Sequence, residues 1–221
     1  MKRPYSTELT QKILSYEDII FDWNGTLLND VDVMLKAEQE QFKNYGINPL
    51  NAKERAKIFS HPIENYYKNV GFDLSKTSFK QLSIEFMEIY EKLSFKNAQL
   101  FEGTIELLDI LKNKNKNLYI LSAASEKHLQ AIVDVKGISS YFKAIYGLHD
   151  HEAKTKIPRA LELKDDFSEL KNSTSLLMVG DTDHDYEVAQ AIGADSIIIA
   201  QGHQAHDKLK KLNTIVLKNR H

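Results

Sequence analysis

Short apolar runs separated by helical patterns are the feature that most constrains the fold of this chain. Apolar runs at residues 19–21, 118–121 and 176–179 are typical of buried strands, and further strands are expected at 142–146, 196–200 and 214–217. Between most of these runs, apolar residues recur at helical spacing. Strands that alternate with helices favour a parallel sheet. We therefore expect an α/β fold with a doubly wound, Rossmann-like parallel sheet.

One long stretch interrupts this alternation. Between residues 30 and 97 we find no strand signals, and helical patterns cover about 33–42, 52–58, 63–70 and 78–93. We interpret it as a helical domain inserted after the first strand, so that residues 1–29 and 98–221 form the α/β core domain. Further helices are expected over about 7–14, after Thr104 as the capping residue, around Leu129, near Pro158, and over 185–192 and 205–212.

Composition excludes several classes of function. The 221 residues carry a formal net charge of −2 and contain no cysteine. This balance gives no electrostatic reason to expect nucleic acid or an anionic membrane as a partner, and thiolate metal sites and disulfides are excluded. No apolar run approaches the roughly 18 residues that suggest a membrane span, and no secretory signal follows the basic start. We expect a cytoplasmic protein.

The stretch FDWNGTLLND at residues 21–30 follows the first expected strand. Asp22 stands where that strand should end, and Asn24-Gly25 indicates a turn. Ligands of parallel α/β folds bind just outside the carboxyl ends of the strands, so a carboxylate there is well placed to act as a nucleophile. Taken alone, the stretch is equally typical of a strand that ends in an ordinary Asx-type turn.

Other strand ends bring further functional groups to the same edge. Ser122 and Asp181 each follow an apolar run, and Asp185 should lie one helical turn beyond Asp181. The carboxylates offer hard oxygen ligands, which suit Mg²⁺. Lys156 can add a positive charge, although Lys154 is a rival. Each residue alone has an ordinary structural explanation: a strand-end hydroxyl, a solvated lysine, or a helix-capping aspartate.

Together these residues resemble the haloacid dehalogenase superfamily, a group of mostly Mg²⁺-dependent phosphatases. The first motif of those phosphatases is Asp-x-Asp-Gly-Thr, and residues 22–26 (DWNGT) match it except at Asn24. Ser122 fits the second motif, Lys156 the third, and Asp181 with Asp185 the fourth. The resemblance covers about residues 18–200, and it identifies the helical insertion with the mobile cap of that family.

The resemblance implies a mechanism. Asp22 would attack phosphorus and form an aspartyl-phosphate, which water hydrolyses. Mg²⁺ would be held by Asp22, the main-chain carbonyl of Asn24, and Asp181, with Asp185 either binding the ion or orienting a neighbour. The phosphoryl oxygens would be held by residues of three motifs, namely Gly25, Thr26, Ser122, Ala123 and Lys156.

Asn24 is the departure that matters, because the family pattern has an aspartate there that protonates the leaving oxygen and activates water. An amide cannot do this. Three explanations remain open: a slow phosphatase that uses substrates with good leaving groups, a phosphate-binding relative without useful turnover, or an engineered residue that traps a ligand. The non-enzymatic alternative is a sensor or interaction protein that binds a phosphorylated ligand.

In this family the cap selects the substrate. Residues 59–67 form a polar, aromatic break between cap helices and are expected to face the site. His61 would contact the substrate there, or would simply be a turn residue beside Pro62. Tyr66, Tyr67 and Phe72 are more typical of the cap core. A helical cap leaves a closed pocket, which favours a small phosphorylated metabolite, and the general pattern is closest to phosphoglycolate-phosphatase-like members. We expect a monomer or weak homodimer.

Rival chemistries share parts of this site. A dehalogenase would use Asp22 without a metal, a phosphonatase would use a cap lysine, and a phosphomutase would need an acid–base group. His149, His151 and His184 also permit a transition-metal hypothesis, which the complete set of oxygen ligands makes unnecessary.

Overall fold

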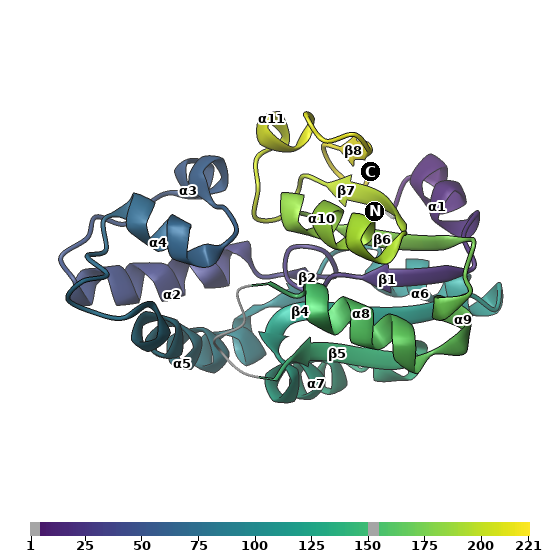
Figure 1. Cartoon of the computed structure of the whole chain (residues 1–221), viewed down its shortest axis with the longest axis horizontal. Coiled ribbons are helices and arrows are strands. Elements are labelled where there is room, and N and C mark those ends of the chain that lie inside the picture. The colour runs from purple at the N-terminus through teal and green to yellow at the C-terminus, as the bar shows by residue number, and fades with distance from the viewer. Residues whose placement is uncertain (1–4, 150–154) are drawn as a thin grey trace.

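A parallel sheet forms the centre of the molecule. The structure is a computed structural model that describes residues 5–149 and 155–221, and within these residues the main sheet has six strands in the order β5-β4-β1-β6-β7-β8 (Figure 1). Its strands are β1 (Asp18–Phe21), β4 (Asn117–Ser125), β5 (Ala144–Leu148), β6 (Leu176–Gly180), β7 (Asp195–Ile199) and β8 (Ile215–Leu217). Every neighbouring pair is parallel. The expected α/β fold with a parallel sheet is confirmed.

Helices cover both faces of this sheet. In the central strand β1, Ile19 and Phe21 belong to one hydrophobic cluster and Ile20 to another, because successive side chains of a strand point to opposite faces. The first cluster packs against α1 (Thr7–Leu14), α6 (Thr104–Asn113) and α7 (Glu126–Val135). The second packs against α8 (Ile157–Asp166), α9 (Ser168–Lys171) and α10 (Asp183–Ile192). The sheet is therefore buried on both sides.

Four helices between the first and second core strands form a separate layer, which we call the inserted helices. They are α2 (Val31–Asn44), α3 (Ala52–Ile58), α4 (Ile63–Val70) and α5 (Phe79–Asn97), and they stand beside the sheet at the left of Figure 1. Their aromatic cluster, separate from the two clusters that cover the sheet, includes Phe42, Phe59, Tyr66, Tyr67 and Phe72. These helices therefore bury apolar surface among themselves.

A small antiparallel ribbon joins the inserted helices to the sheet. It pairs β2 (Leu28–Asn29) with β3 (Gln99–Leu100), so the chain leaves and returns at one place. The sequence analysis did not predict this ribbon, because two-residue strands show no alternation of apolar and polar residues. Two other short elements, α9 and η1 (Ser139–Tyr141), were not predicted either. Helix α11 (His206–Leu209) is shorter than the expected 205–212.

Several expected boundaries were wrong. Thr104 is the first residue of α6, and Gly103 caps that helix with a left-handed backbone at φ +82°. The strand expected to end on Ser122 continues to Ser125, although its pairing with β1 ends at Ile120 and its pairing with β5 shifts register after Leu121. The helix expected from residue 185 begins at Asp183, because Thr182 provides the cap. In the part of the chain described, none of the helices has the length and apolar character needed to cross a membrane.

Candidate active site

Two aspartates meet at the edge of the sheet where β1 and β6 end. Asp22 directly follows β1, and its backbone N–H donates to the Val179 carbonyl of β6 at 2.9 Å. Asp181 directly follows β6. The Thr26 hydroxyl lies 3.1 Å from Asp22 Oδ2 and 3.5 Å from Asp181 Oδ1. The parallel pairing thus brings together two carboxylates that are far apart in the sequence.

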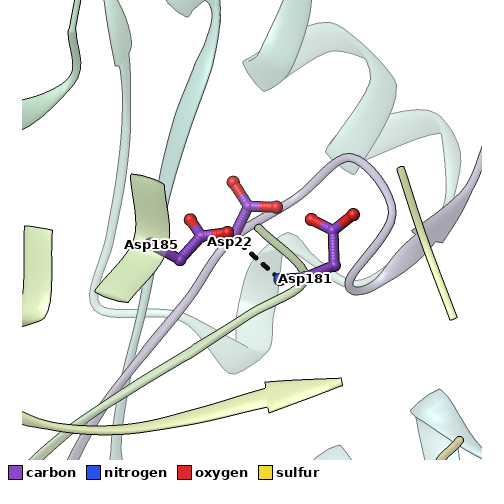
Figure 2. Close-up of side chains that lie close together, drawn as sticks. All are labelled: Asp22, Asp181 and Asp185. Atoms are coloured by element: carbon purple, nitrogen blue, oxygen red, sulfur yellow. Dashed lines mark hydrogen bonds between the residues drawn. The ribbon is translucent and has the colours of Figure 1, made fainter. Parts of the chain in front are cut away.

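Asp185 completes a group of three buried carboxylates. One oxygen from each of Asp22, Asp181 and Asp185 lies within 4.8 Å of the others, and Figure 2 shows the three carboxyl groups close together where their chain segments meet. Three such hard oxygen donors form a set that suits Mg²⁺. Among the residues that the structure describes, no other group of three histidine or acidic side chains meets this criterion.

Space for the Asp181 carboxylate depends on two glycines. A Cβ on Gly25, whose φ is +74°, would lie 2.4 Å from Asp181 Oδ2, and one on Gly202 would lie 2.1 Å from the same atom. Larger residues at these positions would displace the carboxylate. Gly25 is therefore required both by the turn and by the close approach of Asp181.

Lys156 lies between two of the carboxylates. Its Nζ is 2.5 Å from Asp22 Oδ1 and 2.6 Å from Asp185 Oδ1, and only 3 % of the residue is exposed. It precedes α8 as the N-cap residue, so a helix start fixes its backbone. The rival Lys154 lies outside the described residues, whereas Lys156 is in contact with the carboxylate group.

Asp185 has a positioning role that the sequence analysis weighed as an alternative. Its Oδ2 accepts hydrogen bonds from the backbone N–H groups of Asp181 (3.1 Å; dashed in Figure 2) and Thr182 (2.9 Å) and from the Thr182 hydroxyl (2.7 Å). Together with the Thr182 hydroxyl, which accepts from the Asp185 N–H, this makes a capping box at the start of α10. One Asp185 oxygen thus holds the Asp181 loop while the other holds Lys156.

Burial and neighbouring charges shift the proton affinities of this group. Burial, reinforced by the Asp185 and Asp181 carboxylates and opposed by Lys156, raises the pKa of Asp22 to about 8. Burial likewise raises the pKa of Asp181 to about 6. Burial opposes the charge of Lys156, but the Asp185 and Asp22 carboxylates outweigh it and raise its pKa. Three buried carboxylates share one lysine, so ionising all of them is unfavourable without further positive charge, and a cation bound there would favour ionised Asp22 and Asp181.

The Asn24 amide is hydrogen-bonded to residues outside the group of Asp22, Asp181 and Asp185. Its Nδ2 donates to Asp30 Oδ2 at 2.8 Å and to the Tyr90 hydroxyl oxygen at 2.6 Å. The Ser122 hydroxyl lies 3.4 Å from Asn24 Oδ1. Asp30 is fully buried and also accepts from the Gly25 N–H. An aspartate at position 24 would face this buried carboxylate, which gives a physical reason for an amide here.

Comparison with known proteins identifies the family. The sequence matches the family described as "Haloacid dehalogenase-like hydrolase" over residues 19–199. The chain belongs to this family. It is 21% identical to a phosphoglycolate phosphatase from Synechococcus elongatus, over 83% of this chain and 84% of the relative. It is 24% identical to a 5'-nucleotidase from Pseudomonas aeruginosa, over 89% and 88% of the two chains. A haloacid dehalogenase-like hydrolase from Streptococcus pneumoniae has the same fold, with a TM-score of 0.77 at 22% identity over 92% and 93% of the chains.

A cavity of about 200 Å³ lies between the edge of the sheet and the inserted helices of this haloacid dehalogenase-like hydrolase. Its wall includes Asp22, Asn24, Ser122, Ala123, Lys156, Asp181 and Asp185 from the core. From the inserted helices it includes most of residues 59–67, the segment expected to face the site. The expected site residues from all four motifs therefore share one cavity, although Gly25 and Thr26 of the first motif are not part of its wall.

His61 also lines this cavity. Its ring stacks on His184 with centroids 4.7 Å apart, and its Nδ1 lies 3.9 Å from Asp183 Oδ1. The ring nitrogens of His184 contact Glu187 on one side and the Thr155 hydroxyl and Lys156 N–H on the other. These contacts occupy His184, and burial lowers its pKa. The hypothesis of a histidine metal site also involved His151, which lies outside the described residues.

A buried ionic chain links the two sides of the cavity, and the sequence analysis did not find it. Glu38 Oε1 accepts from Arg55 Nε at 2.8 Å, Arg55 Nη1 lies 3.1 Å from His203 Nδ1, and His203 Nε2 lies 3.2 Å from Asp30 Oδ1. The backbone N–H of His203 also donates to Asp181 Oδ2 at 2.5 Å. Glu38 and Arg55 fall on α2 and α3, so only the tertiary fold brings them to the loop that follows β7. The sequence shows a glutamate, an arginine and a histidine at these three positions, and nothing in their spacing indicates that they meet.

Proposed function

We propose that this hydrolase is a Mg²⁺-dependent phosphatase that hydrolyses a small phosphorylated metabolite through an aspartyl-phosphate. The observation that carries the proposal is the contact of Lys156 with Asp22 at the edge where Asp181 also lies. Relatives named phosphoglycolate phosphatase and 5'-nucleotidase support the reaction class. They differ in substrate, so they support a phosphate ester without selecting one.

We propose residues 30–97 as a cap domain over the core domain of residues 1–29 and 98–221. The aromatic cluster of the inserted helices supports this division, because it gives them a core of their own. Val33 and Ala37 of α2 and Tyr90 of α5 belong instead to the cluster that covers the sheet. The ribbon of β2 and β3 supports it as well, since the chain leaves and re-enters the core there. The cap would close the cavity and exclude water, in a protein that acts as a monomer or weak homodimer.

The oxygen donors fit Mg²⁺. Asp22, Asp181 and the Asn24 main-chain carbonyl would hold the ion, and among the described residues the hydrogen-bond contact of Asp181 Oδ1 is a long one, 3.5 Å to the Thr26 hydroxyl. Asp185 is less free, because both of its oxygens already contact neighbours; we propose that it supports the site by holding Lys156 and the Asp181 loop. When bound, Mg²⁺ supplies positive charge that offsets the repulsion between the phosphate and Asp22.

The chain's own residues would then carry the reaction. An Asp22 oxygen attacks phosphorus, the bond from phosphorus to the ester oxygen breaks, and the leaving alkoxide takes a proton from water. Water next hydrolyses the acyl phosphate, which returns the Asp22 carboxylate and releases phosphate. Lys156, the Ser122 hydroxyl and the backbone N–H of Ala123 would hold the phosphoryl oxygens. The Gly25 N–H donates to Asp30 Oδ1 and Leu28 O and the Thr26 N–H donates to Trp23 O, so these two residues would contribute only if the turn rearranged on binding. His61 would contact the rest of the substrate from the cap.

Asn24 would slow both proton transfers. General acid–base groups typically supply about 10²–10⁴-fold in rate, and the amide of Asn24 supplies none of this. Its side chain is committed to Asp30 and Tyr90. This commitment favours one alternative function, a phosphate-ligand-binding relative that acts as a sensor or interaction protein with weak or no turnover.

A panel of phosphorylated metabolites assayed for phosphate release with Mg²⁺ tests the proposal. We expect release from at least one ester, loss of release with a chelator, and loss in the Asp22→Asn variant. Asp165→Asn, at a solvent-exposed carboxylate of α8, is the matched control. Mg²⁺-dependent ligand binding without any release would instead support the sensor.

A further inference from the structure

Much of the cap side of the cavity is apolar and aromatic, beside the polar wall residues Glu38, Arg55, His61, Glu64 and Ser83. Its wall includes Met34, Phe59, Tyr66, Phe79, Phe86 and Met87. The hydroxyl groups of the wall tyrosines already have acceptors: Tyr66 donates to Glu38, Tyr67 to Gln41 and Tyr90 to Asp30. A bound molecule therefore meets ring surfaces and methionine side chains on this side.

Most cationic side chains of the cavity wall are paired. Five residues of the wall carry or can carry a positive charge, and four of them have a carboxylate within 3.2 Å. These pairs are Arg55 with Glu38 (2.8 Å), Lys156 with Asp22 (2.5 Å), His203 with Asp30 (3.2 Å) and His184 with Glu187 (2.9 Å). The fifth, His61, lies 3.9 Å from Asp183, and its buried Nδ1 has no hydrogen-bond partner among the described residues. Among the described residues that line the cavity, a second anionic group on the substrate would therefore find only the His61 ring, which is a cation only when protonated. Burying such a group without a partner is costly.

The stacked pair of Phe86 and Tyr90 adds a preference for flat groups. Their ring planes are within 14° of each other at a centroid distance of 5.9 Å, and both rings line the cavity. Aromatic rings gain more from stacked or edge contacts with such side chains than from area burial alone. The cavity volume of about 200 Å³ leaves room for a ring beside the phosphoryl group.

We propose that the substrate is a phosphate monoester whose leaving group is uncharged and carries an aromatic ring. The inference rests on the proposed phosphatase function and adds the substrate class to it. The core edge would bind the phosphoryl group, and the aromatic wall of the cap would select the ring. A leaving group with its own carboxylate, as in phosphoglycolate, would be rejected.

The first test compares benzyl phosphate with 2-phosphoglycolate. Both esters leave through a primary alkoxide, so the contrast is between an aromatic ring and a carboxylate. We expect kcat/KM for benzyl phosphate to be higher by at least about 10-fold, which corresponds to about 1.4 kcal/mol. Equal values or a preference for phosphoglycolate would overturn the proposal. Thymidine 5'-monophosphate, as a further arm, distinguishes a nucleoside source of the ring from a smaller aryl group.

Two lysine substitutions on α5 give a matched pair. Met87 lines the cavity, whereas Ile84 is 37 % exposed and lies outside the wall. We expect Met87→Lys to add a cation to the wall and to reduce the ratio of kcat/KM for benzyl phosphate to that for 2-phosphoglycolate by at least about 5-fold. Ile84→Lys should leave this ratio unchanged. An unchanged preference in folded Met87→Lys contradicts the proposal. If that variant does not fold, Phe86→Leu takes its place and should lower kcat/KM for benzyl phosphate alone by about 3-fold or more.

Binding separates the failure of this inference from the failure of the proposed function. Benzylphosphonate and phosphonoacetate carry the same contrast on a phosphonate that cannot be hydrolysed as an ester. Calorimetry with Mg²⁺ should show at least about 10-fold tighter binding of benzylphosphonate. If no ester is hydrolysed but this ratio holds, the phosphatase proposal falls and the ligand class stands. If esters are hydrolysed and the ratio is absent or reversed, the ligand class falls.

Discussion

The two sides of the cavity differ in the chemistry of their side chains. On the core side, buried carboxylates and Lys156 lie at the ends of parallel strands, held by the sheet and by the capping box of α10. On the cap side, helices of the insertion present aromatic rings and methionines whose polar neighbours are already paired. The strand ends fix charges in place, and the apolar side chains of the helices can change without disturbing those charges. Arg55 and Tyr90 are exceptions, because they contact His203 and Asp30.

This difference indicates a division of work. Charge control at phosphorus requires groups placed to within fractions of an ångström, and a parallel sheet delivers them. Selection of the leaving group requires only a shaped, mostly apolar wall. Substitutions on the core side should therefore change turnover or stability, whereas those on the cap side should change which ester is used.

The largest effect is expected from Asp22→Asn. The variant removes the proposed nucleophile and keeps the shape of the side chain, so phosphate release should fall by at least about 10³-fold. Phosphate release under saturating Mg²⁺ measures this loss. A loss below tenfold in a folded variant would show that another group attacks phosphorus, and the core side would lose its assigned role.

The next effect is expected from Lys156→Met. Removing the lysine leaves Asp22 and Asp185 buried without their common partner, which should cost about 3–5 kcal/mol in the free energy of unfolding. Urea unfolding without Mg²⁺ measures it, and Lys171→Met, at an exposed ion pair, is the control. Equal stability of the two variants would mean that Lys156 does not stabilise the carboxylates as the distances indicate.

A smaller gain in rate is expected from exchanging the amide and the carboxylate in Asn24→Asp/Asp30→Asn. The double variant supplies an acid–base group at position 24 and keeps an amide opposite it, so Mg²⁺-dependent hydrolysis of an aryl phosphate should rise at least about tenfold. The single variant Asn24→Asp is also expected to increase the rate, but it places two carboxylates 2.8 Å apart, so one of them should stay protonated.

The outcome of the exchange decides why the chain has Asn24. No gain in either folded variant would show that missing acid–base catalysis does not limit the rate. A gain in the double variant together with a stability loss confined to the single variant would confirm that Asp30 favours an amide at position 24.

The smallest effect, a change in the pH dependence of stability, is expected from His128, where α7 of the core contacts α5 of the inserted helices. His128 on α7 contacts Ser94 on α5, with Nε2 and Oγ 3.2 Å apart, and burial lowers its pKa against a weaker opposing effect of Glu91. The unfolded chain therefore binds this proton more readily, and stability should fall as pH drops through about 6.5, the ordinary histidine value. Urea unfolding at two pH values, one on each side of this value, should show a smaller fall for His128→Gln. An identical fall would contradict the assignment.

The core side could be predicted from the sequence because strand ends are local features. An apolar run followed by Asp22 or Asp181 indicates both the strand and the end at which the carboxylate lies. Parallel pairing then places these strand ends at one edge of the sheet. Asp185 was expected nearby because it lies one helical turn beyond Asp181, and Lys156 was favoured because it directly precedes a predicted helix start. The extent of β4 past Ser122 was not predictable, because a register shift there leaves no local pattern.

The cap side was less predictable. The helices were found from their periodicity, but the chain of Glu38, Arg55 and His203 connects residues from three distant segments. Charged residues on helices are usually solvated, so nothing in their spacing marks them as buried. The commitment of Asn24 to Asp30 was hidden too, because a buried carboxylate just before α2 has the sequence of an ordinary helix start.

The most direct test of the central claim is a calorimetric titration of Mg²⁺ into the wild-type chain and the Asp181→Asn variant, with Asp165→Asn as the control. The account predicts that one ion binds to the wild type and to the control with equal affinity, and at least about tenfold more weakly to Asp181→Asn. Equal Mg²⁺ affinity in all three proteins would contradict the claim that the strand-end carboxylates share a cation.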